Sequence, residues 1–160
     1  MRNILWFRRD LRIGDHPALN AAMEGADEII PVFILNKEQI AEAGEKLLAY
    51  MGRSLRALDE SLGNRLHIIE GDAVEVLKDL IKLYDVNEVH ISAEYERYGA
   101  EREAKRATAA LGELGVVALQ VEQRAAGDLH LERRDVDHDH LEVAHARRLQ
   151  VFGAVLHLLV

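Results

Sequence analysis

The sequence predicts an α/β domain: a doubly wound, five-stranded parallel sheet with helices on both faces. Two observations predict this fold. Short apolar runs alternate with segments of helical periodicity through residues 1–121, which is the pattern of βαβ units. Residues 28–35 are apolar almost throughout, as is typical of a strand in a parallel sheet that is buried on both faces.

Strands are expected at residues 3–7, 28–35, 66–69, 89–93 and 116–121. The first helix is expected at residues 17–23, because Pro17 suits a first helical turn and Asp15 just before it is the expected cap. A second helix should end at residues 63–64, Gly-Asn. It is indicated by apolar residues at three- and four-residue spacing, which are Leu47, Leu48, Met51, Leu55, Leu58 and Leu62.

The third and fourth helices have clear end signals. Asp72 with Glu75 three residues later is the pattern of a capping box, so the third helix should begin at Asp72. A fourth helix is expected at about residues 99–113 and should end before Gly115.

Composition and charge narrow the function classes. Lys and Arg number 20 against 28 Asp and Glu, a net charge of −8, so no direct binding to nucleic acid is expected from this chain. No apolar run has the roughly 18 to 20 residues that a bilayer span needs, and we expect a cytoplasmic protein with no membrane partner. The absence of cysteine excludes a disulfide scaffold and a thiol nucleophile.

Residues 122–160 differ in composition from residues 1–121. They hold five of the eight histidines and no Ser, Thr, Pro or Lys. We therefore expect two segments: an α/β domain at 1–121 and an atypical tail at 122–160 that is either disordered or read from a shifted frame. Threonine codons have the form ACN. Consecutive threonine codons read one nucleotide early give NAC, which encodes Asp, His, Asn or Tyr. The Asp and His residues of segment 135–140, DVDHDH, are what a frameshifted Thr-rich linker would encode.

Polar residues follow two of the expected strands, where ligands of open α/β sheets bind. Residues 8–12, RRDLR, follow the first strand. They either form a solvated loop with local ion pairs or bind an acidic partner surface or ligand. Residues 92–99, SAEYERYG, follow the fourth, and they either form a polar turn or bind a heteroaromatic ring. No metal site is expected: the Asp/His alternation at 135–140 would send ligands to opposite sides of a strand.

Several ordered motifs resemble the DNA photolyase and cryptochrome family. Residues 6–12, WFRRDLR, are followed by DHPAL at 15–19, and residues 95–103 read YERYGAERE. The resemblance implies the N-terminal α/β domain of that family, which holds an antenna chromophore of the folate or deazaflavin type. FAD and damaged DNA would be bound by a separate helical domain, before which this chain is expected to stop.

By matching position, the resemblance assigns the antenna site to Phe33, Asn36, Lys46, Glu94 and Glu96. It assigns Arg8, Arg9, Asp10 and Arg12 to structural and interdomain contacts rather than to chemistry, and it gives no catalytic residue. Asn36 stands where many members have Asp, and Lys46 lies beside the position where some have Arg.

The expected function is therefore light harvesting by a domain of deoxyribodipyrimidine photolyase ancestry that is inactive alone in DNA repair. Two alternatives stay open: a non-catalytic nucleotide or small-ligand binding module of the same layered fold, and a truncated gene product without function. The residues do not predict the oligomeric state.

Overall fold

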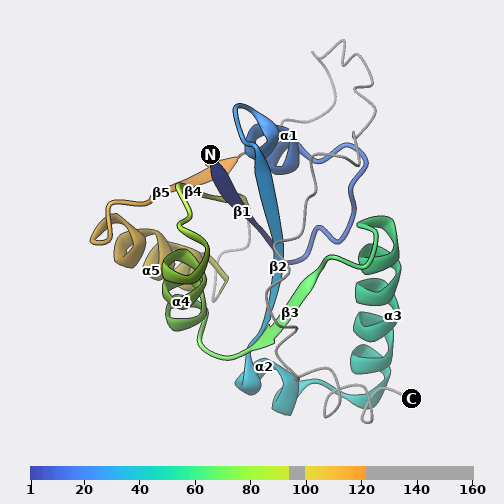
Figure 1. Ribbon diagram of the computed structural model, residues 1–160. Coiled ribbons are helices and arrows are strands. Elements are labelled where there is room, and N and C mark those ends of the chain that lie inside the picture. The colour runs from blue at the N-terminus through green and yellow to red at the C-terminus, as the bar shows by residue number, and fades with distance from the viewer. Residues whose placement is uncertain (94–99, 122–160) are drawn as a thin grey trace.

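A five-stranded, all-parallel sheet with strand order β3-β2-β1-β4-β5 organises the molecule (Figure 1). The structure is a computed structural model, and it describes residues 1–93 and 100–121. The strands are β1 (Arg2–Phe7), β2 (Glu28–Leu35), β3 (His67–Glu70), β4 (Glu88–Ser92) and β5 (Val117–Val121). The helices are α1 (Pro17–Met23), α2 (Lys37–Glu42), α3 (Glu45–Ser61), α4 (Ala73–Tyr84) and α5 (Ala100–Gly112). The predicted fold class is confirmed.

The sheet separates two hydrophobic cores. Ile4 and Trp6 of β1 point into the core that α4 and α5 cover, whereas Leu5 and Phe7 point into the core beneath α1 and α3. This division follows from the alternation of side chains along a strand. Figure 1 shows α3 and the α4–α5 pair on opposite sides of the sheet. Because β1 is buried on both faces, its sequence is apolar without alternation, as the sequence of β2 is.

Most predicted elements lie within a residue or two of their observed bounds. The predicted cap of α4 is confirmed, since an Asp72 carboxylate oxygen accepts hydrogen bonds from the amides of Val74 at 3.0 Å and Glu75 at 3.3 Å. Gly115 follows α5 with φ +74°, a left-handed conformation that favours glycine after a helix. The short helix α2 was not predicted.

The predicted cap of α1 was wrong. His16, not Asp15, is the N-cap, and its Nδ1 accepts a hydrogen bond from the Leu19 amide at 3.1 Å. Asp15 lies one residue too early, in a left-handed turn with φ +49°. A cap must directly precede the first helical residue, because only there does its side chain reach the free amides of the first turn.

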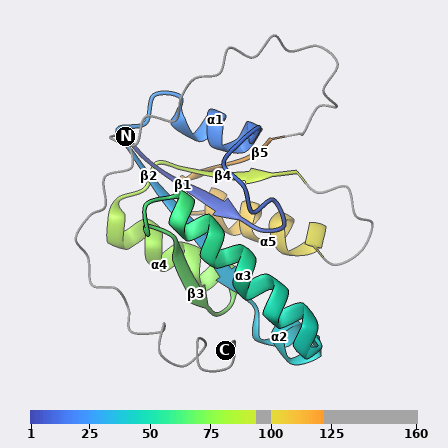
Figure 2. The same ribbon diagram turned by 90° about the vertical axis from the view of Figure 1, so that its right-hand side faces the viewer.

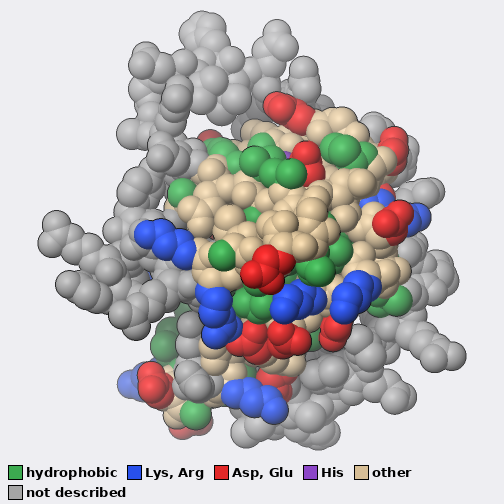
Figure 3. Space-filling model, turned by 90° about the vertical axis from the view of Figure 1, so that its left-hand side faces the viewer, with side chains coloured by type: hydrophobic (Ala, Val, Ile, Leu, Met, Phe, Trp, Pro, Cys, Tyr) green, Lys and Arg blue, Asp and Glu red, His purple; other side chains and the backbone are tan. Residues whose placement is uncertain are grey.

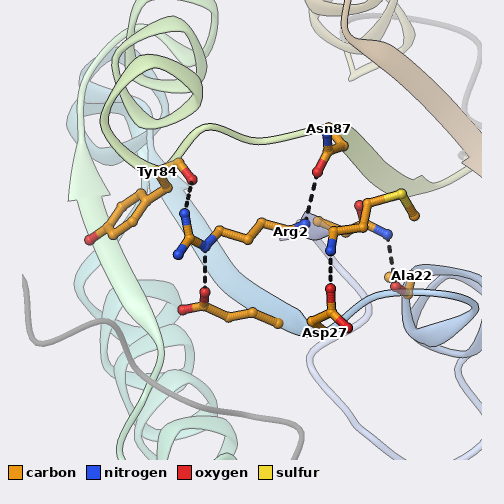
Figure 4. A network of polar contacts seen from close by, with 8 residues as sticks. Arg2, Ala22, Asp27, Tyr84 and Asn87 are labelled. Carbon is orange, nitrogen blue, oxygen red and sulfur yellow. Dashed lines mark hydrogen bonds and ion pairs between the residues drawn. The ribbon is translucent and has the colours of Figure 1, made fainter.

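Polar contacts tie the amino ends of the strands to the neighbouring connections (Figure 4). Arg2 donates through Nε to Glu28 Oε2 at 2.7 Å and through Nη1 to the Tyr84 carbonyl at 3.0 Å. Its backbone amide donates to Asn87 Oδ1 at 2.9 Å, and the Met1 ammonium pairs with Asp27. At the amino edge of the sheet, the polar side chains of these residues are engaged in structural contacts. Ligands of open α/β sheets bind at the opposite, carboxyl edge.

No helix within residues 1–93 and 100–121 is long and apolar enough to cross a membrane.

Candidate functional site

Asp10 lies at the centre of a group of polar contacts at the carboxyl ends of β1 and β4. Its Oδ2 is 2.8 Å from Nε2 of His16, and the same oxygen accepts a hydrogen bond from the Ser92 hydroxyl. Its Oδ1 accepts from the Arg8 backbone amide at 3.3 Å. One carboxylate therefore joins the loop after β1, the start of α1 and the end of β4.

The two ring nitrogens of His16 have different partners. Nδ1 accepts a hydrogen bond from the Leu19 amide, so the ring hydrogen lies on Nε2 and points at Asp10. The ring is 1% exposed and meets the Phe7 ring edge-on at 5.3 Å between centroids. Burial acts to raise the pKa of Asp10, but hydrogen bonds from His16 and Ser92 outweigh it and hold that pKa well below its usual value.

The arginines after β1 have different surroundings. The Arg8 guanidinium carbon lies 5.1 Å from the centroid of the Trp6 ring, within the range of a cation–π contact. Arg12 donates from Nε and Nη2 to the Asp15 carbonyl at 3.3 and 3.1 Å, while Arg9 is exposed. Their assignment to interdomain contacts stays a prediction.

Three of the predicted antenna residues lie on or beyond the carboxyl half of β2. Phe33 is 8% exposed, faces the α3 core and is in register with Phe7 of β1. Asn36 directly follows β2, and its carbonyl accepts from the Ile40 amide at 3.0 Å. Lys46 is exposed in the first turn of α3. The other two, Glu94 and Glu96, lie outside the described residues.

The first two turns of α3 expose apolar side chains next to Lys46. Leu47 is 59% and Tyr50 is 64% exposed, although the helix buries Leu55 and Leu58 farther along. Figure 2 shows α2 beside this end of α3. A cation, an apolar aliphatic side chain and a phenol thus lie on one exposed segment, at the sheet edge where β2 ends.

Sequence reasoning missed His16 and Ser92 as members of the Asp10 group. Ser92 ends a strand that was predicted, and His16 directly precedes a helix that was predicted. Local sequence patterns do not show that β1 pairs with β4. This pairing brings Asp10 and Ser92, which are 82 positions apart in the chain, into contact.

Two further properties of the described residues concern metal ligation and surface charge. Residues 1–93 and 100–121 contain no cluster of three or more His, Asp or Glu side chains arranged for a metal ion, and the Asp/His run at 135–140 lies outside them. Figure 3 shows basic and acidic side chains next to one another on the face it presents. Mixed charge of this kind differs from the basic surface typical of phosphate-backbone binding.

A family model described as DNA photolyase matches residues 3–149. The chain belongs to the DNA photolyase family. Cryptochrome-2 of Gallus gallus is 34% identical over 108 residues, covering 64% of this chain and 19% of that protein. Deoxyribodipyrimidine photo-lyase of Streptomyces griseus is 35% identical over 108 residues, covering 64% of this chain and 24% of that protein.

Solved photolyases share the fold of this family member. A bacterial class III photolyase from Agrobacterium tumefaciens matches with a TM-score of 0.68 and 32% identity, over 76% of this chain and 25% of that one. An archaeal photolyase from Sulfolobus tokodaii is described as having two FAD molecules, with the implication of a novel light-harvesting cofactor. It matches with a TM-score of 0.69 and 29% identity, over 76% of this chain and 29% of that one. This photolyase-family chain thus spans about a quarter of the length of these relatives.

Proposed function

We propose that this α/β domain binds an antenna chromophore of the folate or deazaflavin type beside the carboxyl end of β2. When bound, such a chromophore absorbs near-ultraviolet or blue light. The observation that carries the proposal is the exposed segment at the start of α3, where Lys46, Leu47 and Tyr50 lie together beyond the sheet. The Sulfolobus tokodaii relative, whose description gives the implication of a light-harvesting cofactor, supports a light-harvesting role.

The residues fit a flat heteroaromatic ligand with a polar edge. Leu47 and Tyr50, both more than half exposed, offer a surface on which a ring can pack. The Asn36 side chain carries both a donor and an acceptor. The Lys46 ammonium, exposed at the same end of α3, suits the carboxylates of a folate tail. Phe33 supports this end of β2 from within the core.

Reconstitution tests this proposal. The purified 160-residue chain would be incubated separately with methenyltetrahydrofolate, 8-hydroxy-5-deazariboflavin and ATP, passed through a desalting column and examined by absorbance. We expect one of the two chromophores to be retained. Retention of neither would contradict the proposal, and retention of ATP alone would favour the nucleotide-binding alternative.

Matched variants locate the site. We expect Asn36→Ala and Lys46→Ala each to weaken chromophore binding roughly five- to tenfold, the effect of losing one polar contact. Lys82→Ala is the control, because Lys82 is also an exposed helical lysine but lies in the last turn of α4. Equal affinity in all three variants would place the chromophore elsewhere.

We further propose that residues 1–160 do not repair pyrimidine dimers by themselves. The chain matches only 25% of the Agrobacterium tumefaciens photolyase, so the greater part of such an enzyme has no counterpart here. Cleavage of thymine dimers by the purified chain with added FAD under blue light would overturn this part of the proposal.

A further inference from the structure

Strand β5 presents an exposed apolar row on one face of the sheet. Val117 and Leu119 are 51% and 39% exposed. Their partners in register on β4 are Glu88 and His90. His90 is itself in register with Leu5 of β1, which faces the core beneath α1. The row therefore lies on the α1 face of the sheet.

The neighbouring helices leave much of this row exposed. Helix α1 packs mainly against β4 and β1 and covers β5 only in part. Helix α5 covers the opposite face, where Ala118 packs against the core that α4 and α5 share. Within the described residues β5 is also the last strand of the sheet, so its outer backbone edge adds unpaired amides and carbonyls to the apolar row.

The chain that continues from β5 contains a segment of matching character. Residues 122–160 follow directly after Val121, which is itself partly buried against the α1 core. Within them, residues 151–160 read VFGAVLHLLV, of which eight are apolar and none is Asp, Glu, Lys or Arg. Burying the apolar side chains of such a segment lowers the free energy of the protein.

We propose that residues 151–160 dock on the apolar row of Val117 and Leu119. Residues 122–150 connect the two, and a fully extended chain of that length spans roughly 100 Å, so the connection is long enough for this return. Leu47, Tyr50, Leu83 and Leu114 are also exposed, but they lie on helices or directly after one and offer no strand edge. The proposal is independent of chromophore binding.

Cross-linking tests the proposal in the full chain, which contains no natural cysteine. One double variant carries Leu119→Cys and Leu156→Cys. Its control carries Leu47→Cys and Leu156→Cys, since Leu47 lies on α3, away from β5 in Figure 1. With a short bismaleimide we expect the first pair to link within one chain about tenfold faster than the control, because docking raises the effective concentration of the second thiol.

Equal rates for the two pairs would overturn the proposal, as would a faster control. Links formed mainly between two chains would overturn it too, and would indicate that a second copy covers β5. If circular dichroism shows that Leu119→Cys disturbs the fold, Val117→Cys on the same row is used in its place.

Thiol labelling gives a second readout. In the single variant Leu119→Cys, adding Leu156→Asp should speed maleimide labelling several-fold, because a buried carboxylate opposes docking. Labelling of Leu47→Cys should not change when Leu156→Asp is added. An unchanged rate at position 119 would contradict the proposal.

Discussion

His16 caps α1 with one ring nitrogen and contacts the Asp10 carboxylate with the other, at 2.8 Å from Nε2 to Oδ2. The ring thereby connects the first turn of a helix to the loop after β1. Because Ser92 donates to the same Asp10 oxygen, three elements depend on one side-chain charge.

Replacing that charge should destabilise the protein in a pH-dependent way. We expect Asp10→Asn to lower the free energy of unfolding by about 1.5–3 kcal/mol at pH 7, the range for hydrogen bonds to a charged group. The folded-state pKa of Asp10 is depressed. Its contribution should therefore be fully present above about pH 4, the ordinary range of an unfolded Asp, and be lost as the pH falls below it.

Urea denaturation followed by circular dichroism at neutral and acidic pH measures this difference. Asp79→Asn is the control, since Asp79 is exposed on α4. A difference between Asp10→Asn and the unsubstituted chain that is the same at pH 7 and pH 2.5 would show that the Asp10 charge is not its source.

The core beneath α4 gives a second prediction. Leu77 is fully buried, whereas Leu83, two turns later in the same helix, is 62% exposed. We expect Leu77→Ala to cost about 2–5 kcal/mol of unfolding free energy and Leu83→Ala to change it by about 0.5 kcal/mol or less. Denaturant titration of both variants measures this, and similar costs would mean that α4 is rotated from the orientation described.

The cap of α4 can be separated from its ion pair. Asp72 accepts from two helix amides and pairs with Arg106 of α5. Slight burial acts to raise its pKa, but the hydrogen bonds from Arg106 and the helix amides hold that pKa below its ordinary value. We expect Asp72→Ala to cost about 1 kcal/mol and Arg106→Ala less than about 0.5 kcal/mol, because the pair is exposed.

Thermal unfolding of these two variants at pH 7 and pH 3 distinguishes the contributions. The cost of Asp72→Ala should decrease at the lower pH, since a carboxyl with a depressed pKa loses its stabilising effect as it becomes protonated. A larger loss for Arg106→Ala than for Asp72→Ala would mean that the ion pair outweighs the cap.

Two glycines offer a matched comparison of steric room. A Cβ added at Gly71, just after β3, would lie 2.9 Å from Val76 Cγ2, whereas one at Gly112, the last residue of α5, meets nothing within 4 Å. We expect Gly71→Ala to destabilise the protein by about 1–3 kcal/mol. Gly112→Ala should stabilise it by about 0.4–1 kcal/mol, because alanine has less conformational freedom in the unfolded chain. Melting temperatures that shift in the same direction would contradict this steric account.

Helices and strands that are specified by a local sequence pattern were predicted correctly. The apolar run of β2 and the Asp72 cap are local patterns, and both were found as expected. Helix α2 has only six residues, too few for a periodicity to be recognised. The cap of α1 was misplaced because a histidine, which seldom caps helices, fills the position that Asp15 was expected to fill.

The candidate site was less predictable, because its geometry depends on strand order. Asp10 and Ser92 meet only because β1 pairs with β4. Likewise, the apolar spacing along α3 indicated a helix with one buried stripe, but its first turns extend past the sheet, and this leaves Leu47 exposed. Local periodicity gives the direction of a side chain around its own helix and contains no information on where the covering layer ends.

Trp6 is the only tryptophan in the sequence, and it lies 2% exposed in the core between β1 and α4–α5, with the Arg8 guanidinium over its ring. Its fluorescence therefore reports on one side of the sheet alone. Loosening of that core should shift the emission to longer wavelength, while loosening around His16 on the opposite side should leave the emission colour unchanged. The same indole is an energy donor for any near-ultraviolet absorber bound at the carboxyl edge, so quenching of its emission gives an optical titration that needs no attached dye.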